Sequence, residues 1–220
     1  MNTVISNEFE TKLGRIRSWI ESNRYVLPTN YETKIQSTAA HKITLETFEL
    51  SPDWIPFHMS FESSYCWRWF IEKLNNGIEN VVIYCQLINP SNDAEHSADT
   101  GESLEAILIE DKNHQLHIGT EDSRAMYSRV FNNNCMPDRF REKLYLEEEL
   151  CITSWVEYID FGFKTTIPPL KKGERIYFHY LLATNPIKYS LEHPSEYDVS
   201  TWFAVEQSKH LIDKYLLNSS

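Results

Sequence analysis

Residues 161–184, FGFKTTIPPLKKGERIYFHYLLAT, decide the fold class of this chain. Apolar and polar side chains alternate over 161–167 and again over 175–184, which is the pattern of half-buried β-strands. Pro168, Pro169 and Gly173 lie between the two runs and mark a turn. The stretch therefore predicts two consecutive strands and a mainly β protein.

Further strands are predicted on both sides of this pair. They cover 42–50, 81–85, 104–110, 116–118, 150–159 and 199–205. Lys112-Asn113 marks a turn between 104–110 and 116–118, and residues 89–103 are predicted to be a loop. Within 42–50 the alternation of Ile43 and Leu45 slips by one residue to Phe48 and Leu50, which predicts a β-bulge.

Residues 65–88 fit two structures. Trp67, Trp69 and Ile71 have strand spacing, and Asn76-Gly77 is a strong hairpin signal before the strand at 81–85. Trp67, Phe70, Ile71 and Leu74 also fit a helix that Gly77 would end. We favour the hairpin, and the alternative is an α+β fold with a helix at 64–76.

Helices are predicted at both ends of the chain. Asn7 and Glu10 have capping-box spacing, and apolar residues then recur at helical spacing, so a helix is expected over 8–23. Residues 209–217 predict a closing helix, and 122–131 and 137–144 predict two short ones, the latter starting at Pro137. The chain has no low-complexity linker or repeat, which predicts a single domain over 1–220 with a β-rich body over 42–206.

The segment 163–182 resembles the late strand pair of immunoglobulin-like β-sandwiches, in which a Leu-x-x-Gly-Glu turn, here Leu170 to Glu174, feeds a long alternating strand. Asn75-Asn76-Gly77, followed by Glu79-Asn80-Val81-Val82, looks like an earlier turn in such domains. The resemblance implies an antiparallel Ig-like sandwich. It implies no function, because such sandwiches host many functions.

Six glycines, none closer together than Gly162 and Gly173, exclude several function classes. Dinucleotide fingerprints, P-loops and nucleophile elbows all need closely spaced glycines. The net charge of −11 argues against nucleic acid and anionic membranes and favours a basic partner. The polar N-terminus lacks the pattern of a secretory signal, so we expect an intracellular, cytoplasmic protein.

Residues 89–125 carry −7 of that charge, from nine acids and two bases. The segment is either a solvated loop and hairpin or an electrostatic face that steers a basic partner. A second acidic run, Glu147 to Glu149, has the same two interpretations. The candidate binding residues are Asp93, Glu95, Asp99, Glu102, Glu105, Glu147, Glu148 and Glu149.

Trp67 and Trp69 complete the candidate binding residues. On a strand, both indoles project from one face and Arg68 from the other. On an exposed face the indoles would form a stacking platform for a sugar or a partner side chain. On an inner face they are core residues.

Four cysteines, at 66, 85, 135 and 151, include no Cys-x-x-Cys pair and are expected to be free thiols. Cys135 precedes a predicted helix start, where the pKa of a thiol can be lowered so that it becomes nucleophilic. Cys135 is therefore the one candidate catalytic residue. The alternative interpretation is a loop thiol without a function.

No metal site or cofactor is expected. His114 and His117 are three apart and point to opposite faces of a strand, and His179 reads as a core histidine. The acids near Asp93 do not have EF-hand spacing, which argues against calcium.

These observations favour a non-enzymatic interaction protein, such as an inhibitor or immunity-type protein that uses an acidic face to bind a basic partner. One alternative is a hydrolase that depends on Cys135 or on a carboxylate pair. The other is a glycan- or ligand-binding sandwich that uses Trp67 and Trp69.

Overall fold

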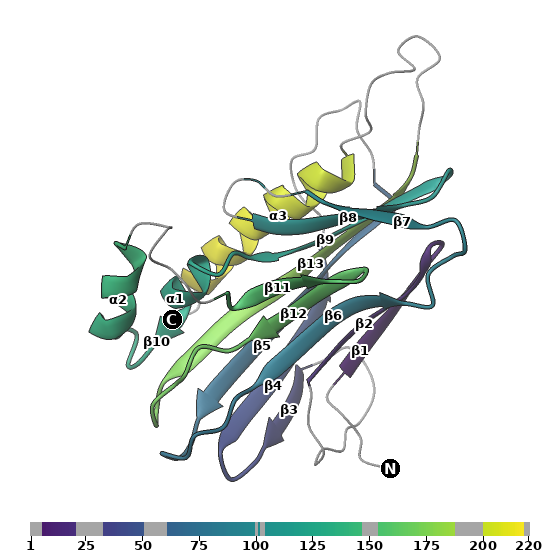
Figure 1. The fold of residues 1–220 in the computed structure, drawn as a ribbon. Coiled ribbons are helices and arrows are strands. Elements are labelled where there is room, and N and C mark those ends of the chain that lie inside the picture. The colour runs from purple at the N-terminus through teal and green to yellow at the C-terminus, as the bar shows by residue number, and fades with distance from the viewer. Residues whose placement is uncertain are drawn as a thin grey trace.

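The computed structural model describes residues 6–20, 33–50, 61–99, 101, 104–146, 154–187 and 200–217 (Figure 1). These residues form two antiparallel sheets, a few helices and their connections, which confirms the prediction of a mainly β, sandwich-like architecture. The finer resemblance to immunoglobulin-like domains stays a prediction.

The smaller sheet has five strands in the order β1, β2, β6, β12, β11. Their bounds are β1 Ser6–Thr11, β2 Gly14–Ile20, β6 Val82–Ile88, β12 Gly162–Thr166 and β11 Val156–Ile159.

The larger sheet has eight strands, seven of them in the order β3, β4, β5, β13, β9, β8, β7, with β10 paired to β13. Their bounds are β3 Thr33–Ser37, β4 His41–Glu49, β5 Ser63–Lys73, β13 Arg175–Pro186, β9 His114–Glu121, β8 Leu104–Glu110, β7 Glu95–Ala98 and β10 Val130–Phe131. The helices are α1 Ala125–Ser128, α2 Asp138–Leu144 and α3 Ser200–Leu217.

The main core lies between the two sheets. Alternate residues of β5, β9 and β13 meet alternate residues of β2 and β6 there, as the period-two pattern requires. The largest fully buried side chains in this core are Trp67, Trp69, Tyr127, Tyr180, Phe163 and Phe178.

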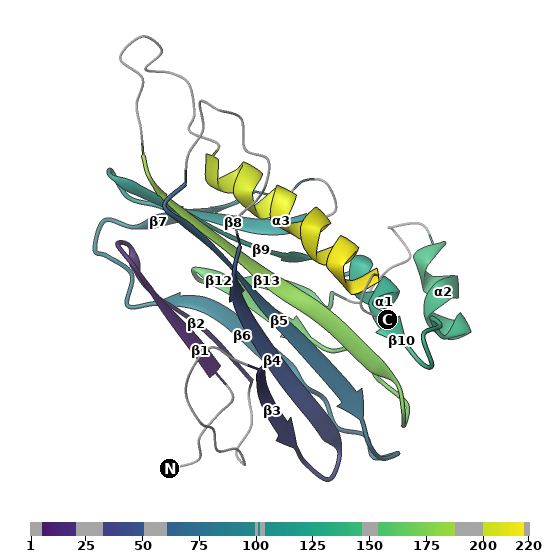
Figure 2. The same ribbon diagram turned by 180° about the vertical axis from the view of Figure 1, so that it is seen from behind.

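The other face of the larger sheet is partly covered by α3, which Figure 2 shows lying obliquely across β8, β9 and β13. Small side chains let the helix approach closely, among them Cys66, Ala106 and Ala183 of the sheet and Ala204 of the helix. At Gly119 an added Cβ would lie only 2.4 Å from Cγ1 of Val205. The helix-covered face and the inter-sheet core are therefore separate apolar clusters on opposite sides of one sheet.

The predicted helix over 8–23 is wrong within the described residues 8–20. β1 and β2 form a hairpin instead, with Ser6 opposite Trp19 and Thr11 opposite Gly14. Ile16 and Ile20 are four positions apart, a spacing that fits both a helix face and one face of a strand. Gly14 has φ +142°, and a Cβ there would lie 2.7 Å from the Asn89 carbonyl oxygen, so glycine is required at this turn.

The strand at 42–50 is confirmed as β4, but the predicted bulge is wrong. The pairing of β4 with β5 is regular from His41 opposite Lys73 to Glu49 opposite Tyr65. Ile43 and Leu45 are buried in the inter-sheet core, whereas Leu50 is buried in the separate cluster beside α3. The slip in the pattern therefore reflects apolar clusters on both faces of the sheet.

Residues 65–73 are a strand, so the alternative with a helix at 64–76 is wrong. The predicted hairpin at Asn76-Gly77 is wrong as well, because β5 belongs to the larger sheet and β6 to the smaller one. The backbone N–H of Gly77 donates to Oδ1 of Asn75, which turns the chain from one sheet towards the other. β12 and β13 are confirmed as strands and are likewise divided between the two sheets.

The predicted strand at 199–205 is wrong over its described residues 200–205. α3 begins at Ser200 and contains the predicted closing helix 209–217 as its second half. Thr201, Ala204, Val205 and Ser208 are buried at helical spacing. Two of them are small polar residues, which hid the periodicity among β-forming neighbours such as Trp202 and Phe203.

The remaining predicted elements are close to those found. The hairpin of β8 and β9 is confirmed, and so is α2, with Pro137 as its N-cap. The helix predicted at 122–131 is reduced to α1, and the loop predicted at 89–103 contains β7. The strand predicted at 150–159 is β11 over 156–159, and residues 150–153 lie outside the described residues. None of the helices in the described ranges is long and apolar enough to span a membrane.

Candidate functional site

Part of the acidic segment 89–125 gathers at one edge of the larger sheet. β7 is the last strand in the described order of this sheet, and all four of its residues are exposed. Glu95 lies directly opposite Glu110 in the pairing of β7 with β8. Asp93 precedes β7 and Asp111 follows β8, so these four acids, here named the acidic edge, fall at the same end of the strand pair. Like charges directly opposite each other destabilise a sheet.

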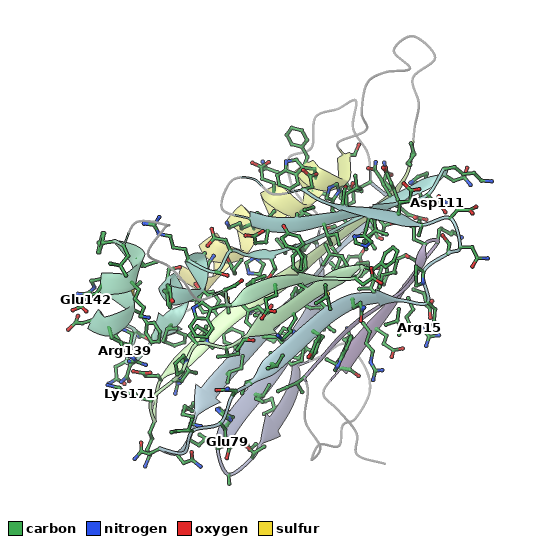
Figure 3. All side chains as sticks on the ribbon, in the orientation of Figure 1. Arg15, Glu79, Asp111, Arg139, Glu142 and Lys171 are labelled. Carbon is green, nitrogen blue, oxygen red and sulfur yellow. The ribbon has the colours of Figure 1, made fainter. Side chains whose placement is uncertain are left out.

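Asp111 is held in place by the turn between β8 and β9. Its Oδ1 accepts hydrogen bonds from the backbone N–H groups of Asn113, at 2.7 Å, and His114, at 2.8 Å. Burial alone would raise the pKa of Asp111, but these bonds hold the pKa below its ordinary value. Figure 3 shows Asp111 at the opposite end of the molecule from Arg139 and Glu142.

Two further acids of the segment, Glu105 and Asp122, accept hydrogen bonds inside the molecule. Glu105 accepts a hydrogen bond from the Tyr158 hydroxyl at 2.7 Å, and burial together with this bond raises the pKa of Tyr158. Asp122 accepts from the backbone N–H of Ala125 at the start of α1. Of the predicted binding residues, the structure therefore brings together Asp93 and Glu95. Glu102 and Glu147 to Glu149 lie outside the described residues.

Asp99 belongs to a three-residue arrangement beneath α3. The buried His117 of β9 lies with Nε2 2.9 Å from Oδ2 of Asp99 and with Nδ1 2.8 Å from Oγ1 of Thr201 in the first turn of α3. A carboxylate, an imidazole and a hydroxyl in this order resemble a catalytic relay. However, Thr201 is 0% exposed, whereas the side chain of Asp99 is 46% exposed, so the hydroxyl is sealed from a substrate. The arrangement ties the start of α3 to the sheet.

The Asp99–His117 contact predicts a pH dependence. The hydrogen bond from His117 is the main reason that the pKa of Asp99 lies below its ordinary value, and it outweighs burial, which raises the pKa. The folded-state pKa is thus below the unfolded one. The carboxylate therefore stabilises the fold fully above the unfolded pKa, about 3.9, and this stabilisation is lost as pH falls through the folded pKa.

In a His117→Gln variant, the pKa of Asp99 measured by NMR of its carboxyl carbon is expected to rise towards the ordinary value. The pKa of Asp111, which is set by backbone N–H groups, is expected to stay unchanged in the same spectra. An unaltered pKa of Asp99 would contradict the assignment. Asp99→Asn is the complementary variant. Because its side chain does not titrate, its free energy of unfolding should fall less than that of the wild type when the pH is lowered through the pKa of Asp99.

A second buried polar cluster joins β9, β13 and the residue after α1. Oε1 of Glu121 lies 3.0 Å from a guanidinium nitrogen of Arg129 and 3.1 Å from Nδ1 of His179, and both Glu121 and His179 are 0% exposed. Arg129 also donates to the hydroxyl of Tyr177 at 2.9 Å. His179 is therefore the core histidine that the sequence predicts, and Glu121 does not contribute charge to the surface.

Trp67 and Trp69 both point into the core between the sheets. They are at most 2% exposed, and Nε1 of Trp69 donates to Oγ of Ser18 at 3.2 Å. No indole surface is left for stacking on a sugar, so the platform interpretation of these two residues is corrected to a core role.

Cys135 is exposed at a tight turn before α2. Asn132 and Cys135 form an isolated bridge, and Asn133 and Asn134 between them have φ of 46° and 61°. Within the described part of the chain the Cys135 thiol makes no hydrogen bond. Cys66 and Cys85 are buried, and burial raises the pKa of both thiols. Cys151 lies outside the described residues.

His114 and His117 fall on opposite faces of β9, as expected from their spacing: His117 contacts Thr201 of α3, and the residues flanking it, Leu116 and Ile118, enter the inter-sheet core. Across the ranges that the structure describes, no three His, Cys, Asp or Glu side chains gather as a metal ligand set.

The chain matches no protein-family model and no curated protein.

Proposed function

We propose that this protein is a non-enzymatic interaction protein, of the inhibitor or immunity type, that binds a basic protein partner through the acidic edge. The observation that carries the proposal is the gathering of acids at this edge: Glu95 is exposed on the outer strand β7 and lies directly opposite Glu110 of the neighbouring strand β8. Carboxylates concentrated in this way favour association with a cationic partner.

Protection of the strand edge does not by itself explain an acid at position 95. A Lys there would protect the edge of β7 as well. Asp93 and Asp111 add further negative charge at the same end, and Asp111 is fixed there by its turn. Such a field raises the association rate with a cationic surface.

The hydrolase alternative draws no support from the hydroxyl and thiol candidates among the described residues, Thr201 and Cys135. The hydroxyl of Thr201 is sealed beneath α3, and the Cys135 thiol has no hydrogen-bonded base in that part of the chain. The proposal includes a cytoplasmic location, which the free thiols of Cys66, Cys85 and Cys135 support, because reducing compartments keep thiols unpaired. It also includes the Ig-like kind of sandwich, which two antiparallel sheets support.

The test is an affinity capture from native extract at low and at high salt. The bait is the full chain, its Asp93→Lys/Glu95→Lys variant, or a control with Asp138→Lys/Glu142→Lys on α2. Both variants change the net charge equally, and all four residues are exposed.

We expect the wild type and the control to retain one stoichiometric partner at low salt and the edge variant to retain about tenfold less, with loss of the partner at high salt. The proposal fails if no stoichiometric partner is retained, or if the edge variant and the control retain it equally.

A further inference from the structure

The outer face of the larger sheet carries ordered rows of side chains beside α3. The pairing of β4, β5 and β13 aligns Lys42 with Glu72 and Arg175 in one row. The next row aligns Thr44, Phe70 and Tyr177, and the one after it aligns Glu46, Arg68 and His179. Aromatic rings therefore lie between two rows of charged groups.

A groove of about 310 Å³ lies over these rows. Phe70 and Phe131 supply its aromatic lining, and Lys42, Glu46, Glu72 and Arg175 supply its charged lining. Phe131 comes from β10, which pairs with the first residues of β13 and places a second ring beside the row of Phe70 and Tyr177. The volume falls at the lower end of the range of about 300–1,000 Å³ that is typical of small-molecule sites.

The charges that line the groove are only partly paired with one another. Nε of Arg68 donates to Oε2 of Glu46 at 2.8 Å, and Arg175 contacts Glu72 with one nitrogen at 3.4 Å. The Lys42 ammonium is exposed and, within the described part of the chain, makes no hydrogen bond or ion pair. The charged lining thus consists of two cations, Lys42 and Arg175, and two anions, Glu46 and Glu72. Because Arg68 already pairs with Glu46, the positive charge of Lys42 is not offset by an ion pair within the described part of the chain.

We propose that this groove binds a small planar aromatic anion, with its ring against Phe70 and Phe131 and its carboxylate or phosphate group held by Lys42 and Arg175. Arg175 has five N–H donors and uses one of them towards Glu72, so donors remain for a second anion. Charge-assisted hydrogen bonds from two cations fix the anionic group, while the aromatic rows supply the apolar area. The site lies on β4, β5 and β13, several strands away from the acidic edge on β7 and β8.

The experiment titrates the ¹⁵N-labelled full chain with 2-naphthoate, with 2-naphthyl phosphate and with the cationic analogue 2-naphthylmethylamine. We expect an anion to shift the amide signals of Lys42, Phe70, Phe131 and Arg175, with the amine binding at least about tenfold more weakly. The tighter of the two anions assigns the carboxylate or the phosphate as the preferred group.

Lys42→Gln is expected to weaken the binding of the preferred anion by about tenfold, because it removes one charge-assisted contact. The matched control is Lys112→Gln, which removes an exposed lysine in the turn between β8 and β9 and should leave the affinity unchanged. The Asp93→Lys/Glu95→Lys variant should also bind the anion normally, which separates this site from the proposed function. Absence of shifts with either anion, equal binding of the amine, or equal affinity of Lys42→Gln and Lys112→Gln would each overturn the proposal.

Discussion

Replacing Trp69 with alanine is expected to lower the free energy of unfolding by about 3–5 kcal/mol, the range for removing a large aromatic side chain from a core. Trp69 is 0% exposed at the centre of the inter-sheet core. Its Nε1 donates to Oγ of Ser18, and that hydroxyl in turn donates to the Tyr84 carbonyl at 2.9 Å. The substitution removes apolar contacts and the one side-chain hydrogen bond through which Trp69 links β5 of one sheet to β2 of the other.

Trp19→Ala is the matched control, because Trp19 lies on the outer face of β2 and stacks on Tyr84 at 5.0 Å between ring centroids. We expect it to cost about 1 kcal/mol, since the loss is one stacked pair and one cation–π contact with Arg17 at a partly exposed site. Urea unfolding of the full chains, followed by circular dichroism, measures both values. Equal losses for the two variants would contradict the place of Trp69 in the core.

Glu121→Gln is expected to cost a similar amount, about 3–5 kcal/mol, because it removes one charge from a buried ionic cluster. Glu121 is 0% exposed and its carboxylate offsets the charge of Arg129 at 3.0 Å. In water the same pair would be worth little, but here the guanidinium is left facing a neutral amide in a region of low polarity.

The control for this prediction is Glu157→Gln, which breaks the ion pair with Lys164 at 2.9 Å on the partly exposed surface of β11 and β12. Its cost is expected to stay below about 1 kcal/mol. The double variant Glu121→Gln/Arg129→Met should be more stable than the sum of the two single losses implies, because it removes both charges. A purely additive double variant would show that the two side chains are not coupled.

The strands of this protein were largely predictable from sequence, because a strand buried on one face imposes a period of two on its residues. The run 161–167 is an example, whereas 104–110 and 175–184 are predictable as largely apolar runs because both of their faces are covered. The N-terminal hairpin was not predictable in this way. The spacing of Ile16 and Ile20 fits both the helical period and the strand period. Glycine is required at Gly14 because the carbonyl oxygen of Asn89, which is distant in the sequence, lies too close for a side chain.

The pairing of the strands was harder to predict than the positions of the strands in the sequence. Asn76-Gly77 is typical of a hairpin, yet the chain at this point passes between the sheets. The local sequence predicts only a change of chain direction. β5 joins the larger sheet by pairing with β13, and β6 joins the smaller sheet by pairing with β12, and both partners are distant in the sequence. The first half of α3 was missed for another reason: its contact face uses Thr201, Ala204 and Ser208, which are small enough to lie flat on the sheet.

The candidate site was predictable only as a concentration of charge. Counting acids identified Asp93 and Glu95, but the opposition of Glu95 and Glu110 depends on strand register, which the sequence does not state. Glu121 belonged to the same count and is buried. The groove was missed entirely, since Lys42, Phe70 and Arg175 come from three strands and become neighbours through pairing alone.

The position of β13 in the larger sheet has a consequence for synthesis of the protein. β13 lies between β5 and β9, and its Arg175 contacts Glu72, 103 positions earlier in the chain. While the chain emerges from the ribosome, the β4–β5 pair and the β8–β9 hairpin remain apart, each with an edge that β13 will later cover. Such open edges attract other strands. We therefore expect the nascent chain to be most prone to aggregation in the interval before β13 has left the ribosome.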